Sequence, residues 1–172
     1  MIPSTRVFRR FAGRGALLRL TTVLWLELLA ELERRADGVR ESGAFLLARR
    51  DSDRRTVAAV IYFDDLDRDA LRGGIALGTA AFARLWDRCR DLDLRVVGDV
   101  HTHPASWVCQ SPIDRANPMI AQARHVALIV PNLAAGVVTT RDVGVHLYGG
   151  DRGWTSWCDG SRQSKLYIGR WA

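Results

Sequence analysis

Two histidines one residue apart, directly behind a short apolar run, restrict the fold of this chain more than any other segment. Residues 94–97 read Leu-Arg-Val-Val, and residues 98–104 read Gly-Asp-Val-His-Thr-His-Pro. Residues i and i+2 of a β-strand face the same side, so a strand that ends here would direct both imidazoles to one point. Asp114 lies eleven residues after His103, and the intervening loop could bring it back to that point.

These side chains are the ligands that a hydrolytic zinc site needs. Such a site has three protein ligands and an open position for water, and His101, His103 and Asp114 could supply the three. It also needs a general base and a donor to the developing oxyanion, and Ser111 is placed to be that donor. A second interpretation stays open, in which Ser111 caps a helical turn that starts at Pro112 and the histidines are surface or capping residues.

The remainder of the chain predicts a mixed α/β fold. Apolar residues at helical spacing predict helices over 22–36, capped by Thr21 or Thr22, and over about 78–91. In the second helix we expect a shared buried side that holds Phe82, Leu85, Trp86 and Cys89. Short apolar runs, rich in β-branched and aromatic residues in 56–63, predict strands over 15–20, 41–48, 56–63, 95–97, 125–130, 143–148 and 154–157.

This uneven alternation predicts an α+β or mixed α/β class, with one central mixed sheet flanked by helices. We divide the chain into a basic N-terminal arm over 1–14, one domain over 15–158 and a C-terminal tail over 159–172. A length of 172 residues fits a single domain with a sizeable core.

The charge of the chain limits the classes of partner. The net charge is +6, and it comes from arginine, because lysine is almost absent. The arginines occur as scattered pairs without interleaved aromatic residues, so we expect no nucleic-acid surface. A solvated basic surface and a specific acidic protein partner both remain open as explanations.

The cysteines and the apolar segments predict a compartment. Cys89, Cys109 and Cys158 are odd in number and lack CxxC spacing, which argues against a disulfide framework and against a thiolate zinc cluster. The apolar stretch 23–30 contains a glutamate and is too short to cross a bilayer. We therefore expect a cytoplasmic protein with reduced thiols and no membrane association.

The spacing of the histidine segment resembles a known family. His-x-His, seven residues, Ser111, two residues and Asp114 match the JAMM motif of the JAB/MPN-type zinc metallopeptidases at every position. Members of that family also carry a glutamate upstream, often as ExGGxLxG, and Glu41-Ser-Gly-Ala-Phe-Leu-Leu-Ala over 41–48 fits its place. Ala44 and Ala48 stand where glycines are usual. The resemblance extends over residues 17–154.

The resemblance implies a single JAB/MPN-like domain with a cytidine-deaminase-like sheet and a Zn²⁺ ion. It makes His101, His103 and Asp114 the metal ligands. It makes Glu41 the general base, which takes a proton from the attacking water and passes it to the leaving amine. Ser111 becomes the residue that stabilises the tetrahedral intermediate.

Family members cleave isopeptide or peptide bonds at the C-terminus of ubiquitin or ubiquitin-like proteins. The Arg-rich, compact composition looks bacterial, so we expect a deubiquitinase-like isopeptidase that accompanies ubiquitin-like conjugation enzymes, some of which act in antiphage defence. Two alternatives are a peptidase that acts on a sulfur-carrier protein and a non-catalytic MPN-type interaction module. The sequence leaves the modifier and the oligomeric state open.

Several residues near the motif have more than one interpretation. Asp99 could orient a ligand histidine or face solvent. Trp107 could cover the site or pack locally, and Cys109 could approach the metal, although a loop thiol without a role fits better. For His125 and His146 we expect structural roles. Whether the loop 104–110 covers the metal site is not determined by the sequence.

Overall fold

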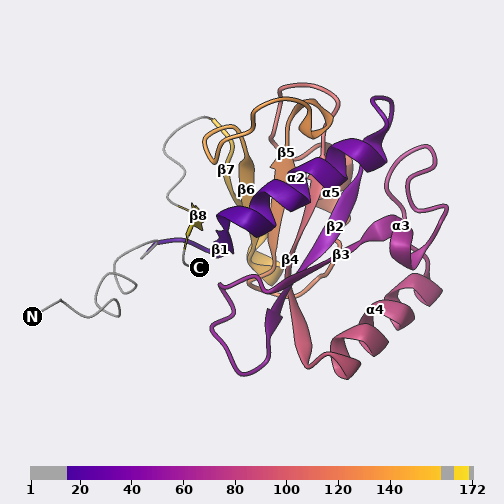
Figure 1. Cartoon of the computed structure of the whole chain (residues 1–172), viewed down its shortest axis with the longest axis vertical. Coiled ribbons are helices and arrows are strands. Elements are labelled where there is room, and N and C mark those ends of the chain that lie inside the picture. The colour runs from indigo at the N-terminus through magenta and orange to yellow at the C-terminus, as the bar shows by residue number, and fades with distance from the viewer. Residues whose placement is uncertain (1–14, 160–164, 171–172) are drawn as a thin grey trace, which may run out of the picture.

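The computed structural model describes residues 15–159 and 165–170, so the predicted N-terminal arm over 1–14 lies outside the described residues. A six-stranded sheet in the order β3-β2-β4-β5-β6-β7 forms the centre, and β1 and β8 form a separate two-stranded sheet. Neighbouring strands of the large sheet are antiparallel except β4 and β5, which are parallel. The predicted class, a mixed sheet flanked by helices, is confirmed (Figure 1).

The strands span Leu18–Thr21 (β1), Gly43–Arg49 (β2), Ala59–Tyr62 (β3), Leu94–Thr102 (β4), Val126–Val130 (β5), Gly144–Tyr148 (β6), Trp154–Trp157 (β7) and Leu166–Gly169 (β8). The α-helices span Thr22–Ala36 (α2), Phe63–Leu66 (α3), Thr79–Asp91 (α4) and Pro112–Ala116 (α5). Two 3₁₀ turns span Asn132–Ala134 (η1) and Gly150–Arg152 (η2).

Helix α2 covers one face of the large sheet. Its N-cap is Thr21, whose side chain accepts a hydrogen bond from the backbone N–H of Leu24 at 3.1 Å. It ends at Asp37, which has the left-handed φ of 51° that is common just past a helix. Its buried stripe belongs to the same apolar cluster as Ala44, Leu46 and Ala48 of β2.

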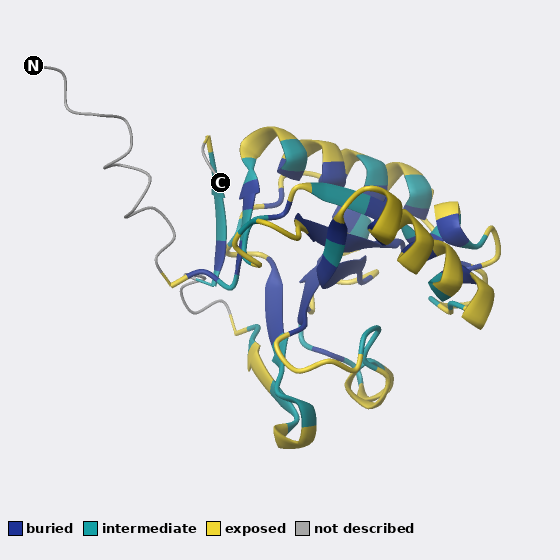
Figure 2. Cartoon of the chain, turned by 90° about the horizontal axis from the view of Figure 1, so that it is seen from below, coloured by how far each residue is buried: buried dark blue, intermediate teal, exposed yellow. Residues whose placement is uncertain are grey.

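Helices α3 and α4 cover the opposite face. Phe45 and Leu47 of β2 point to this side, because successive side chains of a strand alternate, and they pack with Phe63 and Leu85. The central strands are accordingly buried from both sides, as the dark ribbons of Figure 2 show. Trp86 was expected on the buried side of α4, but it is 46% exposed, because the helix buries only the narrower stripe of Ala81, Leu85 and Cys89.

The small sheet joins the two ends of the described chain. Strand β8, in the segment that the sequence sets apart as a tail, pairs in parallel with β1, from Leu18 opposite Leu166 to Thr21 opposite Gly169. Leu18, Leu20 and Leu166 are buried in the same cluster as α2. The C-terminal segment is therefore part of the packing around α2.

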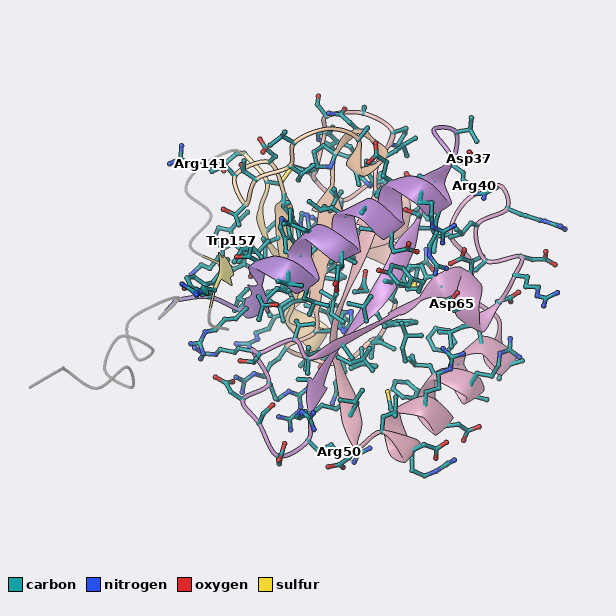
Figure 3. The ribbon with its side chains drawn as sticks, in the orientation of Figure 1. Asp37, Arg40, Arg50, Asp65, Arg141 and Trp157 are labelled. Atoms are coloured by element: carbon teal, nitrogen blue, oxygen red, sulfur yellow. A yellow bond between two sulfur atoms is a disulfide. The ribbon has the colours of Figure 1, made fainter. Side chains whose placement is uncertain are left out.

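The surface carries charged side chains in many directions. The labelled residues Asp37, Arg40, Arg50, Asp65 and Arg141 are all exposed and come from several parts of the chain (Figure 3). Within the described residues, no helix combines the length and the apolar character that crossing a bilayer requires.

Candidate metal centre

The first two candidate ligands come from the end of β4. The sequence predicts a strand over 95–97, but β4 continues to Thr102, because Gly98 to Thr102 pair in parallel with Val126 to Val130. His101 therefore lies within the sheet, and His103 follows directly after it. Both imidazoles are buried, with 7% and 6% of the residue exposed.

Glu41 reaches the same place from the start of β2. The next residue, Ser42, is fully buried; its N–H donates to Oγ1 of Thr102 at 2.9 Å, and its hydroxyl donates to the Leu32 carbonyl of α2 at 2.7 Å. A Cβ on Gly43 would lie 2.4 Å from the Phe63 ring and 2.7 Å from the Val100 carbonyl, so the close approach of β2 to β4 requires glycine here. Glu41 is thus held beside the end of β4.

Asp114 and Ser111 are held by a capping box at the start of α5. The N–H of Asp114 donates to Oγ of Ser111 at 3.1 Å, and the N–H of Ser111 donates to Oδ2 of Asp114 at 2.7 Å. The capping interpretation of Ser111 is confirmed, and it leaves the hydroxyl proton free to donate elsewhere, because Oγ uses only a lone pair in the cap. Trp154 of β7 fixes α5 from outside, since its indole N–H donates to the Arg115 carbonyl at 3.1 Å.

The structure brings the three predicted ligands together. Nε2 of His101 lies 3.2 Å from Nε2 of His103 and 3.9 Å from Oδ1 of Asp114, and Nε2 of His103 lies 3.5 Å from Oδ2 of Asp114. Two donors of a tetrahedral zinc ion at about 2.0–2.1 Å from the metal stand about 3.3 Å apart. The three side chains therefore could bind a metal ion with little movement.

The surroundings of His103 set the tautomer of its neutral ring and the charge of the neighbouring carboxylate. Nδ1 of His103 lies 2.9 Å from the Trp107 carbonyl, so it carries the proton in the neutral ring and Nε2 has the lone pair. Burial alone would raise the pKa of Asp114, but its bonds to His103 and Ser111 lower it well below the usual range. In the absence of a metal, burial opposes protonation of His103, whereas the Asp114 carboxylate raises the pKa of His103 above its usual value.

A second carboxylate lies behind His101. Asp99 is 2% exposed; its Oδ1 accepts from Nε2 of His125 at 2.5 Å, and its Oδ2 lies 3.9 Å from Nδ1 of His101. Burial alone would raise the pKa of Asp99, but its interactions with His101 and His125 lower it, so the group is an anion. The alternative in which Asp99 faces solvent is wrong.

The loop 104–110 is fastened to neighbouring strands. His146 of β6 is fully buried, and its Nε2 donates to the Val108 carbonyl at 3.0 Å while Nδ1 accepts from Oγ of Ser156 at 2.9 Å. Burial lowers the pKa of His146 to about 4, so the ring is neutral at neutral pH. Cys109, which follows Val108 in the loop, forms a disulfide with Cys158.

That disulfide corrects the sequence analysis. The expectation of three reduced thiols is wrong for Cys109 and Cys158, and only Cys89 is a free, buried thiol. The two cysteines are 49 residues apart in sequence, and β6 and β7 bring them together, so spacing gave no signal of the pairing. Cys109 is consequently not a metal ligand.

The loop is also bound to the turn that follows β5. The N–H of Asn132 donates to the Ala105 carbonyl at 3.0 Å, and the N–H of Leu133 donates to the His103 carbonyl at 2.8 Å. Asn132, Leu133 and Ala134 have φ values of 53°, 55° and 65°, the left-handed region that side chains other than glycine rarely adopt.

The ligands line an open pocket of about 870 Å³. Glu41, Ser111 and the three ligands all line it. Trp107 stacks on the His103 ring with centroids 5.6 Å apart and remains 52% exposed, so the loop flanks the ligands and does not close over them. Residues 72–77 line another part of the same pocket.

Comparison with known proteins finds solved structures that are similar to this one. No protein-family model matches the chain. Protein DSY2949 of Desulfitobacterium hafniense is similar with a TM-score of 0.62 and 21% identity, over 88% of this chain and 92% of that one. A protein of Salinibacter ruber is similar with a TM-score of 0.56 and 21% identity, over 81% and 88%.

A third structure, the JAB1/MPN domain protein AF2198 of Archaeoglobus fulgidus, has a TM-score of 0.43 and 13% identity, over 88% of this chain and 99% of that one. At these identities the likeness to the D. hafniense and S. ruber proteins concerns the fold. The chain therefore shares its fold with these two proteins over most of its length.

Proposed function

We propose that this protein is a JAMM-type zinc metallopeptidase that hydrolyses an isopeptide or peptide bond at the C-terminus of a ubiquitin-like modifier. The observation that carries the proposal is the convergence of His101, His103 and Asp114 in one pocket with Glu41 and Ser111. These are the residues at which the sequence matches the JAMM motif and its upstream glutamate.

The donor set suits zinc in a catalytic role. Two imidazole nitrogens and one carboxylate oxygen are a usual set for a hydrolytic zinc site, whereas magnesium and calcium prefer oxygen ligands alone. A zinc ion held here would supply a water with a pKa near 7 and polarise the scissile carbonyl.

Glu41 is suited to move the proton. Glu41 lines the pocket but is not among the three candidate ligands, so its carboxylate would be free to accept a proton from the attacking water. The same carboxyl can then give this proton to the departing amine. The hydrogen bond from the Ser42 N–H to Oγ1 of Thr102 keeps Glu41 beside the end of β4 during both proton transfers.

Ser111 is suited to stabilise the oxyanion. Its Oγ accepts the N–H of Asp114, which orients the side chain and leaves the hydroxyl hydrogen available to the substrate carbonyl. The cap therefore lets the same serine position Asp114 and take part in the reaction.

An extended C-terminal tail is the substrate that best fits the pocket. Cleavage requires the tail to lie beside the metal between the loop 104–110 and residues 72–77, where backbone groups can pair with it as an added strand. Arg72 is the cationic side chain among the residues that line the pocket, and the chain carries a net charge of +6, so an acidic modifier body would be attracted.

The test is replacement of Glu41 by Gln, assayed on a panel of ubiquitin-like and sulfur-carrier proteins with C-terminal extensions. We expect hydrolysis to fall by about 10²–10⁴-fold, the usual loss of a general base, with stoichiometric zinc retained in elemental analysis. The control is Glu33→Gln, at an exposed position on α2, which should leave hydrolysis unchanged.

Undiminished hydrolysis by Glu41→Gln with zinc still bound would remove Glu41 from the mechanism. Absence of zinc from the purified wild-type protein after zinc loading would overturn the metallopeptidase proposal itself. Cleavage of one modifier in the panel, abolished by a chelator, would identify the class of substrate.

A further inference from the structure

The pair formed by Asp99 and His125 is the most deeply buried contact between a carboxylate and a histidine next to the candidate ligands. Both side chains are 2% exposed, and Nε2 of His125 lies 2.5 Å from Oδ1 of Asp99. Burying a carboxylate is costly unless it is paired and hydrogen-bonded, so a core built only for packing would place an apolar residue here. The roles proposed for the three ligands, Glu41 and Ser111 do not account for why this pair is buried.

The second oxygen of Asp99 faces a candidate ligand. Its Oδ2 lies 3.9 Å from Nδ1 of His101, while Nε2 of the same ring faces His103 and Asp114. This distance is about 0.9 Å longer than a usual N–H···O bond. A small rotation of the His101 ring would bring Nδ1 within hydrogen-bond distance of this oxygen.

The sheet fixes the direction of this approach. Asp99 and His101 are two residues apart on β4 and point to the same face, and both are paired on either side by β2 and β5. His125 is held at the start of β5, because its N–H donates to Gln122 and its carbonyl accepts from Tyr148. The backbone of each of the three residues, His125, Asp99 and His101, is therefore held in place.

The two candidate ligands are oriented in different ways. His103 donates from Nδ1 to a neutral backbone carbonyl, that of Trp107, whereas His101 faces an anion. A carboxylate behind a ligand histidine fixes its tautomer and makes its other nitrogen a better donor to the metal.

We propose that Asp99 is a positioning residue for the metal site, which accepts the Nδ1 proton of His101 so that Nε2 presents its lone pair to the metal, and that His125 holds Asp99 in this orientation. This inference rests on the metal site of the proposed function. It adds two residues, Asp99 and His125, to the three ligands.

The closing experiment uses Asp99→Asn, which keeps the shape of the side chain. The Asn oxygen can still accept from His125, but its NH₂ group then faces Nδ1 of His101, so the acceptor for the Nδ1 proton is lost. We expect zinc affinity, measured by competition with a chromophoric chelator, to fall by about 10–100-fold. In the zinc-free protein, the ¹⁵N shifts of His101 should change from the Nδ1–H form to the Nε2–H form.

His125 provides variants that leave the charge of Asp99 in place. His125→Leu should weaken zinc binding less than Asp99→Asn does, and His125→Gln, which keeps an N–H donor, should recover part of that loss. The matched control is Cys89→Ser at a buried position on α4, which should lower the melting temperature without any change in zinc affinity or in the His101 tautomer.

Two outcomes separate this inference from the proposed function. If His103→Ala abolishes zinc binding while Asp99→Asn leaves the affinity and the His101 tautomer as in the wild type, the positioning role is wrong and the zinc site stands. If His103→Ala retains wild-type zinc affinity, the zinc site itself fails, and the role of Asp99 fails with it.

Discussion

The two sides of the pocket are held in place by very different means. The ligand wall, residues 103–111, is joined to β6 by His146, to the segment after β7 by the Cys109–Cys158 disulfide and to η1 by two backbone hydrogen bonds. The second wall, residues 72–77, contains Gly73 and Gly74 at positive φ, and Ile75 and Leu77 are half-buried against the α4 cluster. Its Ala76 N–H donates to the Ala70 carbonyl at 2.9 Å.

Under the proposed function, this difference corresponds to a division of roles between a metal-binding wall and a substrate-binding wall. A metal site must hold its donors within a fraction of an ångström, so its wall is fixed by covalent, hydrogen-bonded and packed contacts at once. A wall that meets an extended peptide needs shape and backbone groups more than fixed side chains, and glycines there permit the chain to adapt. Weakening one wall at a time tests whether the other wall responds.

Removal of the disulfide should have the largest effect on stability. Replacing Cys109 and Cys158 together by Ser removes a cross-link between residues 49 apart, and we expect the free energy of unfolding to fall by about 2–4 kcal/mol. Zinc affinity should also fall, because His103 and Ser111 lie at the ends of the loosened loop. Urea denaturation and chelator competition measure the two effects.

The single replacement Cys89→Ser is the comparison for this variant, because Cys89 is a free buried thiol away from the loop. If the double variant loses stability but binds zinc as tightly as the wild type, the disulfide is not part of what holds the ligand wall.

Protonation of His146 should loosen the same wall at low pH. Its pKa is about 4 in the fold and near 6.5 when unfolded, so between these values the unfolded chain binds the extra proton. Stability therefore rises with pH through this window, and the His146 contribution, about 3 kcal/mol at 1.36 kcal/mol per unit, is lost as the pH falls from 6.5 to 4.

His146→Gln isolates this contribution, because Gln can keep the donor to the Val108 carbonyl but does not titrate. The variant should show a smaller change in unfolding free energy than the wild type between pH 6.5 and pH 4. Equal slopes in the two proteins would mean that other groups, and not His146, set the acid sensitivity.

A change in the second wall should have the smallest effect on stability and should act on the substrate. Ile75 is half-buried, so Ile75→Ala should cost about 1 kcal/mol of unfolding free energy. Zinc affinity should be unchanged, while the KM for a modifier fusion should rise several-fold. Leu92→Ala, at an exposed residue after α4, is the control and should change neither.

A loss of zinc affinity in Ile75→Ala would show that the two walls are coupled. The division of roles between them would then be wrong.

Local patterns predicted the elements well. Helical periodicity gave α2 to the residue, and the Thr21 cap was among the two candidates, because capping and apolar spacing are local properties. The predicted strand over 95–97 stops short of the end of β4 at Thr102, because that end depends on contacts that are not local in sequence. His101 and Thr102 are polar residues that enter a strand because β5 pairs with them, and that pairing is not visible in the sequence around them.

The sequence predicted which residues form the candidate site, but not the contacts that hold those residues in place. The resemblance to the JAMM motif identified His101, His103, Ser111 and Asp114, because that motif is defined by residues at fixed spacings along the chain, and the structure brings the three candidate ligands together. The contacts of His125 with Asp99 and of His146 with Val108 depend on the order of strands in the sheet. Side chains that meet across a sheet leave no fixed spacing in the chain, so both histidines were expected only to be structural.

The turn η1 has a consequence for which substitutions the protein can accept. Three successive residues, Asn132 to Ala134, have left-handed backbone conformations that cost about 1–2 kcal/mol each. This conformation directs two of their N–H groups to the carbonyls of Ala105 and His103. A residue branched at Cβ would be strained at any of the three positions. The chirality of amino acids, and not the chemistry of zinc, thus restricts this stretch, and a chain that lost the inverted turn would lose support for its ligands without losing a single one of them.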